Sequence, residues 1–376
     1  MKYVPLTSSE ALEGGKAALC YTTVEVSQDE LTQVSKKYGI PLFGCTSFQG
    51  VFTPEGFLRG AHSLLWEKGD EVKVVPYLVE CGPDDARMKV REGVERMLSE
   101  VSKPDLILMH ATPGFEERVI EGVEDVLGTG VPIYGGSAAD DDVSGKWRVF
   151  LNDVSTQSGA LLVAMKHEKG EIYGGFLGGY FPSDKRGRVT RCEGRVIYEI
   201  DGRPAAEVYN EWTGGAIGEY LEKGGVVLGA TTLRPLGRVI GDFKGIPQYL
   251  LSHPHMVFEG SRALSCFTEF QEGDEVVLME GFKTALIDRT SHVYERAVSF
   301  HRRKGTPRGG ILIYCGGCVG AVLDSVQEIN QKYRESIGEG VPFIGAATFG
   351  EEGCMYTKEG VDNRHGNLMT DTIVIM

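Results

Sequence analysis

The chain has 376 residues, of which 41% are hydrophobic and 24% charged, and both fractions are ordinary for folded globular proteins. Its 53 acidic residues outnumber its 39 basic ones, and the net charge of −14 argues against nucleic acid or an anionic membrane as a partner. Glycine is the exception, because its 51 residues are about twice the usual share of roughly 7%, which predicts many tight turns or close backbone approaches.

Neither targeting nor covalent cross-linking is indicated. The longest apolar run, residues 311–323, contains three glycines and is well short of the roughly 20 residues that a membrane span needs. Residues 1–15 lack the apolar block of a signal peptide, and the eight cysteines are too scattered for a disulfide framework. We therefore expect a cytoplasmic protein with reduced thiols, without a membrane or nucleic-acid partner, a metal or a cofactor.

A short pattern occurs three times along the chain. Residues 40–46, 131–137 and 341–347 each read as a β-branched residue, proline, two apolar residues and glycine. An apolar stretch typical of a strand precedes each copy, and between this stretch and the copy apolar residues recur at helical spacing. A hairpin and another apolar strand follow each copy. Each unit is thus predicted to form a right-handed β-α-β crossover followed by a hairpin.

A different region separates the second copy from the third. Residues 196–202 read as a strand that runs into an Asp-Gly turn, and residues 205–212 as a helix opened by Pro204. The polar residues 181–187 read as a connector. The predicted fold class is therefore α/β with mixed parallel and antiparallel sheets, in two domains (1–185 and 186–376) built partly from repeated β-α-β-hairpin units.

Candidate binding residues lie where the predicted parallel strands end, because ligands of open α/β sheets bind there. Glycines at these ends let a ligand approach the backbone, although they also serve tight turns and strand–helix packing. They do not match a Walker loop or a dinucleotide fingerprint. The predicted ligand-binding residues are Gly44, Cys45, Thr46, His110, Thr112, Gly135, Gly136, Ser137, Asp140, Cys315, Gly316, Gly317, Gly345, Thr348 and Glu351.

Two carboxylates in this set are interpreted as amine-binding groups. Asp140 and Glu351 follow corresponding Pro-Gly motifs, and each can accept an ammonium group, while the glycine-lined strand ends offer N–H groups to a carboxylate. The alternatives are a loop or helix cap for Asp140 and a solvated turn for Glu351. The run Asp140-Asp141-Asp142 lacks the spaced pattern of a calcium loop, so no metal is predicted.

Cys315-x-x-Cys318 has three interpretations. A redox pair suits a strand-to-helix junction, since the helix N-terminus lowers the pKa of a thiol. Cys315 could instead be a nucleophile with His110 as its base, which requires the two domains to converge. Most buried thiols are inert. No second pair of metal ligands accompanies the motif, so zinc is not predicted, and the sequence favours a protein that is not an enzyme.

The order of these motifs resembles the FIST family, named for F-box and intracellular signal transduction proteins. The resemblance rests mainly on residues 41–47, 131–140, 199–209 and 342–351 and covers nearly the whole chain. One departure is Gly316-Gly317-Cys318, where the family often places an arginine after the cysteine. The resemblance implies a sensory protein that binds a small ligand, an amino acid or a derivative, and acts on a signalling or ubiquitin-pathway partner. A protein-docking scaffold is the alternative that it also implies.

Overall fold

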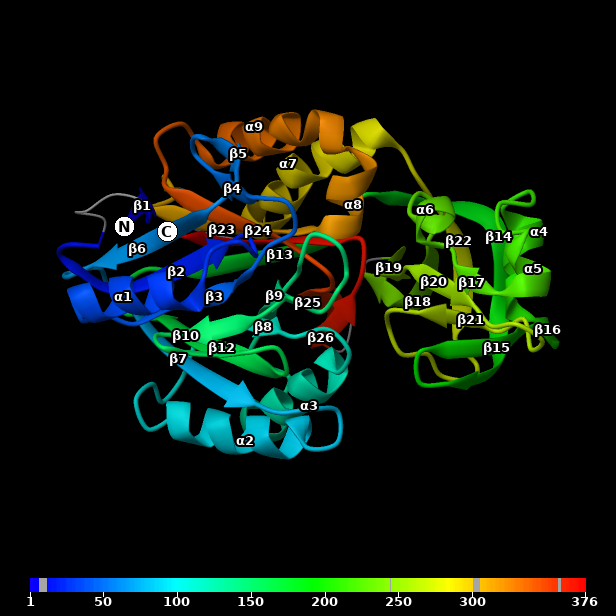
Figure 1. Ribbon diagram of the computed structural model, residues 1–376, viewed down its shortest axis with the longest axis horizontal. Coiled ribbons are helices and arrows are strands. Elements are labelled where there is room, and N and C mark those ends of the chain that lie inside the picture. Colours follow the sequence, from blue (N-terminus) through cyan, green and yellow to red (C-terminus); the bar gives the residue numbers. More distant parts are fainter. Residues whose placement is uncertain (7–11, 244, 300–304, 358–359) are drawn as a thin grey trace.

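The computed structural model describes residues 1–6, 12–243, 245–299, 305–357 and 360–376, and it has two lobes (Figure 1). The larger lobe, here called the body, comprises residues 1–179 and 282–376. The small lobe comprises residues 180–281 and lies at the right of Figure 1. The chain enters the small lobe at Tyr180 and leaves it at Gly281, and these two residues are paired partners in adjacent antiparallel strands.

The body contains three six-stranded sheets, and equivalent strands follow one another in the same order in each of them. The first is β1 (Lys2–Pro5), β6 (Ala61–Glu67), β2 (Gly15–Thr22), β3 (Leu42–Thr46), β10 (Val149–Leu151) and β11 (Val154–Thr156). The second is β7 (Val72–Glu80), β12 (Gly159–His167), β8 (Leu106–Ala111), β9 (Ile133–Gly136), β25 (Glu351–Thr357) and β26 (Gly360–Gly366). The third is β13 (Ile172–Gly178), β27 (Met369–Ile375), β23 (Gly309–Cys315), β24 (Phe343–Thr348), β4 (Val51–Thr53) and β5 (Gly56–Leu58).

Each sheet has one parallel pair at its centre: β2 with β3, β8 with β9, and β23 with β24. Its outer two strands are a hairpin from another part of the chain. The β10–β11 hairpin extends β3, the β25–β26 hairpin extends β9, and the β4–β5 hairpin extends β24. The three sheets are therefore linked in a closed cycle.

Helices cover the outer faces of these sheets (Figure 1). The body helices are α1 (Gln28–Tyr38), α2 (Ala86–Met97), α3 (Glu116–Leu127), α7 (Lys283–Ser299), α8 (Gly316–Ala321) and α9 (Val326–Ile337), with a short 3-10 turn, η1 (Leu323–Ser325). α1 shows how local sequence fixes such an element. A reciprocal capping box of Ser27 and Glu30 opens it, and Gly39 closes it in the left-handed conformation.

The small lobe is built around a single sheet with its own apolar core. Its strands are β14 (Tyr180–Glu193), β15 (Val196–Ile200), β16 (Arg203–Pro204), β17 (Gly225–Val226), β18 (Leu236–Phe243), β19 (Ile246–Ser252), β20 (Pro254–Val257), β21 (Leu264–Cys266) and β22 (Glu275–Gly281). Its helices are α4 (Ala205–Trp212), α5 (Tyr220–Lys223) and α6 (Leu228–Thr231).

The predicted fold class, α/β with mixed sheets in two domains, is confirmed. Residues 181–187 differ from the expected connector, because they lie within β14 and pair with β22. They read as a connector because most of their side chains are exposed in this strand. The domain division at residue 185 falls inside β14 and stays a prediction. Among the described residues, no helix is both long and apolar enough to cross a bilayer.

Candidate functional site

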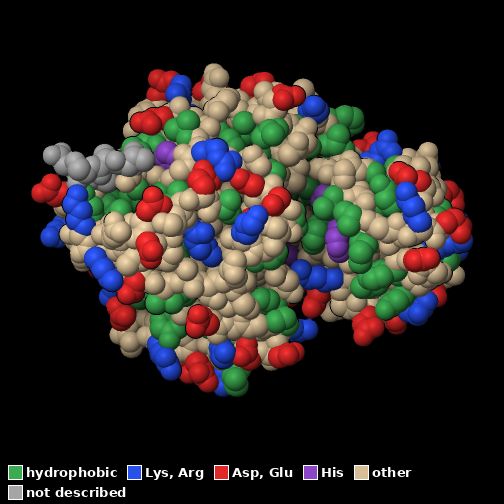
Figure 2. Space-filling view, viewed as in Figure 1, with side chains coloured by type: hydrophobic (Ala, Val, Ile, Leu, Met, Phe, Trp, Pro, Cys, Tyr) green, Lys and Arg blue, Asp and Glu red, His purple; other side chains and the backbone are tan. Residues whose placement is uncertain are grey.

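A cavity of about 580 Å³ lies between the two lobes and is here called the interlobe cavity. Figure 2 shows the groove at this place, with histidine and hydrophobic side chains on its wall. The body lines it with Phe48, Pro113, Glu116, Val143, Trp147, Cys315, Gly316, Gly317, Gly320, Ala321, Phe349, His365 and Asn367. The small lobe lines it with Arg195, Leu228, Gly229, Thr232, Leu233, His253 and Phe267.

Aromatic rings face the cavity from both lobes. On the body, the ring of Phe349 lies 6.0 Å from that of Phe48 and 6.1 Å from that of Trp147, measured between centroids. On the small lobe, Phe267 stacks on His255 at 4.7 Å and meets His253 edge-on at 6.0 Å. A cavity with such walls suits a ligand with a flat apolar part.

The strand ends of the body hold two of these rings in place. Phe48 comes shortly after β3 and donates its backbone N–H to the carbonyl of Ala347 at 2.9 Å. Phe349 directly follows β24 and donates in the same way to Ser137 at 3.1 Å. The ends of the parallel strands therefore form the cavity wall, as the sequence predicts for ligand sites of α/β sheets.

A buried cluster of charges closes one end of the cavity. Glu116 and Glu117 lie in the first turn of α3, and Arg195 reaches them from the turn between β14 and β15 of the other lobe. The Arg195 Nη2 atom lies 2.6 Å from the Glu116 carboxylate and also contacts Glu117. His365, on β26, donates through Nδ1 to Glu352 at 3.1 Å and through Nε2 to the Phe267 carbonyl at 3.2 Å.

The charges in this cluster stabilise one another. Burial alone would raise the pKa of Glu116, but Arg195 and His365 hold it at about 2. Burial likewise opposes the charged form of His365, yet the neighbouring Glu116 and Glu117 and its bond to Glu352 raise its pKa to about 9. Ligand atoms of Glu116, Glu117 and His365 lie within 4.8 Å of one another, the spacing of a metal site. Arg195 already supplies the positive charge there.

Three of the predicted binding residues line the interlobe cavity: Cys315, Gly316 and Gly317. Ser137 lies beside its charged end, since its hydroxyl donates to Glu116 at 2.7 Å. The remaining members of the predicted set lie elsewhere in the body, and their binding role stays a prediction.

The predicted base, His110, is fully buried between two partners. Its Nδ1 lies 2.8 Å from the Gly136 carbonyl, which can only accept, so we assign the proton to this nitrogen. Its Nε2 then accepts from the Tyr21 hydroxyl at 2.9 Å. Burial lowers the pKa of His110 to about 4, and both ring nitrogens are satisfied within the body.

The two carboxylates predicted to bind an ammonium group are engaged locally. Asp140 accepts backbone N–H groups from Lys146 at 2.7 Å and Asp142 at 3.3 Å, which is the geometry of a loop cap. Glu351 accepts from the Thr348 hydroxyl at 2.9 Å and from the Met369 backbone at 3.0 Å. Burial raises the pKa of Glu351 well above its ordinary value, which disfavours its charged form.

The other predicted residues have packing contacts. A Cβ on Gly44 or Gly135 would lie 1.7 Å from a carbonyl oxygen of the neighbouring strand, and one on Gly345 would lie 2.7 Å from such an oxygen. Gly136 and Cys45 are buried strand residues. Thr46 accepts from the Arg148 backbone at 3.0 Å, and Thr112 forms hydrogen bonds with Gly159.

The sequence interpretation missed Glu116, Arg195, His365, Trp147 and Phe267. They come from segments far apart in the chain, and no local spacing connects them. One signal was available in the sequence. Acidic residues are favoured in the first turn of a helix, which is where Glu116 and Glu117 lie, and Arg195 in a Gly-Arg turn can form an ion pair with them.

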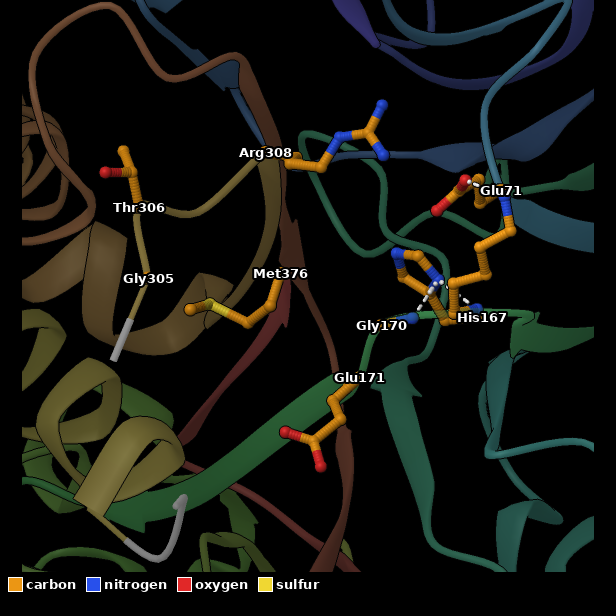
Figure 3. Close-up of a pocket in the computed structure, with 9 residues that line it drawn as sticks. Glu71, His167, Gly170, Glu171, Gly305, Thr306, Arg308 and Met376 are labelled. Atoms are coloured by element: carbon orange, nitrogen blue, oxygen red, sulfur yellow. Dashed lines mark hydrogen bonds and ion pairs between the residues drawn. The ribbon is translucent and has the colours of Figure 1, made fainter. Parts of the chain in front are cut away.

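A second cavity, of about 460 Å³, lies on the body near the last residues of the chain (Figure 3). Its charged residues are mostly paired: Lys169 binds Glu71 at 2.7 Å, and Arg308 binds Asp70 at 2.9 Å. His167 accepts the Gly170 backbone N–H at 2.8 Å, which Figure 3 marks with a dashed line. The described residues that line this cavity include no Phe, Tyr or Trp and all belong to the body, so we take the interlobe cavity as the candidate site.

Comparisons with known proteins find two domain matches in this chain. Residues 16–203 match the FIST N domain, and residues 205–354 match the FIST C domain. FIST domains are generally associated with signal transduction and small-ligand sensing.

Two individual proteins are also similar to parts or all of the chain. An uncharacterized protein of Methanocaldococcus jannaschii is 29% identical over 218 residues, which cover 52% of this chain and 41% of the relative, so the chain spans less than half the length of that curated relative. A solved structure of cyanuric acid hydrolase aligns with 100% of this chain and 98% of that chain at 7% identity, and its TM-score of 0.36 is too low to carry an argument. On the two domain matches, which together span most of its length, the chain belongs to the FIST family.

Proposed function

We propose that this protein is a sensor that binds a small molecule in the interlobe cavity and relays its occupancy through the contact between the lobes. The observation that carries the proposal is that both lobes line one cavity, with aromatic rings on each side and an ion pair that joins the two lobes. A ligand between two lobes is stabilised by both, so its binding changes how firmly they are held together.

The ligand class that we propose is an amino acid or a derivative with an aromatic side chain. The walls offer ring faces to a flat apolar group. The charged end of the cavity offers a positive and a negative group side by side, since Arg195 can bind a carboxylate and Glu116 can bind an ammonium group. A zwitterion matches this pair, whereas a ligand with a single charge would leave one member of it without compensation.

The relay requires a partner, and a signalling or ubiquitin-pathway protein is the class that the family implies. The partner would recognise the lobes in the arrangement that the ligand favours. The cytoplasmic location expected from the sequence suits such a partner and stays a prediction.

Tryptophan fluorescence provides a direct test, because the three tryptophans have different positions. Trp147 lines the cavity, Trp66 is fully buried in the body, and Trp212 belongs to α4 of the small lobe. We expect titration with aromatic amino acids to give a saturable change in emission that Trp147→Phe abolishes. The matched control Trp212→Phe should retain the change.

Thermal unfolding gives an independent measurement of binding. A ligand at 100 times its dissociation constant stabilises the folded protein by about 2.7 kcal/mol. We expect Arg195→Gln to weaken this stabilisation, because it removes the positive charge that lines the cavity between the lobes. Stabilisation that neither Trp147→Phe nor Arg195→Gln reduces would place the ligand elsewhere. No stabilisation by any amino acid would favour the docking scaffold.

A further inference from the structure

The cavity wall contains a pair of cysteines whose chemistry the proposed sensor does not use. Cys315 ends β23 and is the N-cap residue of α8, and Cys318 follows within the first turn of that helix. Cys315 is 4% exposed and lines the interlobe cavity, whereas Cys318 is fully buried behind it. Both are free thiols in this structure.

Cys318 lies among groups that stabilise a negative charge. Its sulfur is 3.3 Å from the hydroxyl of Tyr180, whose proton is also within reach of the Thr232 carbonyl at 2.9 Å. The thiol of Cys315 forms a hydrogen bond with Cys318, which raises the pKa of Cys315 and lowers that of Cys318. Cys315 is therefore the donor and Cys318 the acceptor of this bond.

Arg289 supplies the opposite charge from α7. Its side chain is 1% exposed, and its guanidinium lies 4.0 Å over the ring of Tyr314. Nη1 donates to the Leu368 carbonyl at 2.8 Å, but within the described part of the chain the Nε and Nη2 groups have no hydrogen-bond partner. A buried guanidinium with unpaired N–H groups requires a compensating negative charge nearby.

The acidic groups that interact with Arg289 include Glu351, Asp371 and Cys318. Burial raises the pKa values of Glu351 and Asp371 well above their ordinary range, which disfavours their charged forms. Burial also opposes ionisation of Cys318, but its bond to Cys315, the charge of Arg289 and Tyr180 together lower its pKa to about 6. The other seven cysteines, all within the described residues, have raised pKa values. Of these acidic groups, Cys318 is the one whose pKa is lowered, so Arg289 favours its thiolate form.

We propose that Cys315 and Cys318 are a redox-active dithiol, which a small hydroperoxide entering the interlobe cavity oxidises to a disulfide. The inference rests on the contacts of Cys318, the unpartnered Arg289 and the position of Cys315 at the cavity wall. It does not depend on which ligand the sensor binds.

The reaction proceeds in two balanced steps. The proton of Cys315 first passes to the Cys318 thiolate, and the resulting Cys315 thiolate attacks one oxygen of the hydroperoxide ROOH. The O–O bond breaks and the leaving alkoxide takes the proton back from Cys318, so that the products are Cys315 sulfenic acid, the alcohol ROH and the Cys318 thiolate. The Cys318 thiolate then attacks the sulfenic sulfur, which forms the S–S bond and releases hydroxide. The two sulfurs together lose two electrons, and the hydroperoxide gains them.

The local backbone suits this ring closure. Residues three apart in a helical turn are neighbours on its surface, close to the separation of disulfide-linked cysteines. The two residues between the cysteines, Gly316 and Gly317, have no side chains and also line the cavity. They leave the sulfur of Cys315 open to a small oxidant.

The test exposes the reduced, full-length protein to tert-butyl hydroperoxide at pH 7, followed by alkylation and peptide mass analysis. We expect a Cys315–Cys318 disulfide, accompanied by the loss of two hydrogens. Of the eight cysteines only Cys318 has a lowered pKa, so at pH 7 this pair carries a thiolate that proton transfer can place on Cys315, and the pair should react ahead of the other cysteines. Cys20 and Cys45, which lie buried on adjacent strands, are the internal control.

Variants separate the two steps. Cys318→Ser should stop the reaction at Cys315 sulfenic acid, which dimedone traps, and Cys315→Ser should leave no disulfide. Tyr180→Phe keeps the ring but removes the hydroxyl that contacts Cys318. We expect it to move the midpoint of the rate–pH profile upward, a change that altered packing alone would not produce.

Two results would overturn the proposal. One is oxidation of Cys315 and Cys318 no faster than that of Cys20 and Cys45. The other is a disulfide that links a different pair while the protein remains folded. In either case ligand binding measured through Trp147 would be unaffected, so this failure is distinguishable from failure of the sensor proposal.

Discussion

At the scale of single residues, one buried histidine contributes to the charged contacts between the lobes. His365 is 3% exposed and contacts a carboxylate through one ring nitrogen and a carbonyl through the other. Because both partners accept hydrogen bonds, both nitrogens must donate, and the ring is therefore an imidazolium. Glu116, Glu117 and Glu352 surround it with negative charge, and Arg195 is the nearby cation.

This ionisation predicts how stability depends on pH. The pKa of His365 is about 9 in the folded protein and 6.5 ordinarily, so the folded state binds the extra proton between these values. Its contribution is complete below pH 6.5 and is lost as the pH rises through 9. Glu352, whose burial raises its pKa to about 7, changes stability in the same direction at lower pH.

We therefore expect the free energy of unfolding to fall between pH 6.5 and 9, and His365→Gln to flatten that fall. Urea unfolding at several pH values measures it. His62→Gln is the control, because burial lowers rather than raises the pKa of His62. Equal pH slopes for His365→Gln and the unmodified protein would contradict the assignment.

At the scale of elements, the glycines of the three Pro-Gly motifs have one physical cause. Gly44 and Gly135 lie in β3 and β9, where the parallel neighbour brings a carbonyl oxygen within 1.7 Å of the place a Cβ would take. Gly345 in β24 has the same contact at 2.7 Å. Neither strand of such a pair can move aside, because each is also hydrogen-bonded to a further strand of its sheet.

We expect Gly135→Ala to lower the free energy of unfolding by about 3 kcal/mol or more, since added volume in a packed core costs about 1–3 kcal/mol even where the backbone can yield. Gly345→Ala should cost less, because its clash is milder. Gly130→Ala is the matched control on the same loop–strand segment, as nothing lies within 4 Å of its Cβ position. Urea titration gives all three values, and equal stability of Gly135→Ala and Gly130→Ala would refute the steric explanation.

The elements also show what the sequence can and cannot predict. The three parallel pairs could be predicted because each rests on local signals, namely an apolar strand, an amphipathic helix and the Pro-Gly motif. The strand with which each hairpin pairs could not be predicted, because the local sequence that forms the β25–β26 turn does not indicate that β25 pairs with β9. The charged end of the cavity was missed for the same reason: Glu116, Arg195 and His365 meet only because distant segments do.

At the scale of the whole molecule, the exchanged hairpins make the body a single unit. β4–β5 completes the sheet of β23 and β24, while β25 completes the sheet of β8 and β9. β13, from the first half of the chain, pairs along its length with β27, near the end of the chain. The small lobe differs, because its strands pair among themselves around their own core.

This arrangement predicts the behaviour of fragments. Residues 1–185 alone lack β24, β25 and β27, which pair with β4, β9 and β13, so we expect this fragment to show no cooperative thermal unfolding. Residues 180–281 retain the β14–β22 pair and the small-lobe core, so we expect them to unfold cooperatively, though at a lower temperature than in the full chain. Mixing 1–185 with 186–376 should restore cooperative unfolding, because each fragment carries hairpins or strands that complete the sheets of the other. Circular dichroism melts of the three samples measure this directly. Cooperative unfolding of residues 1–185 by themselves would instead support the division at residue 185 and show that the exchanged hairpins are dispensable for folding.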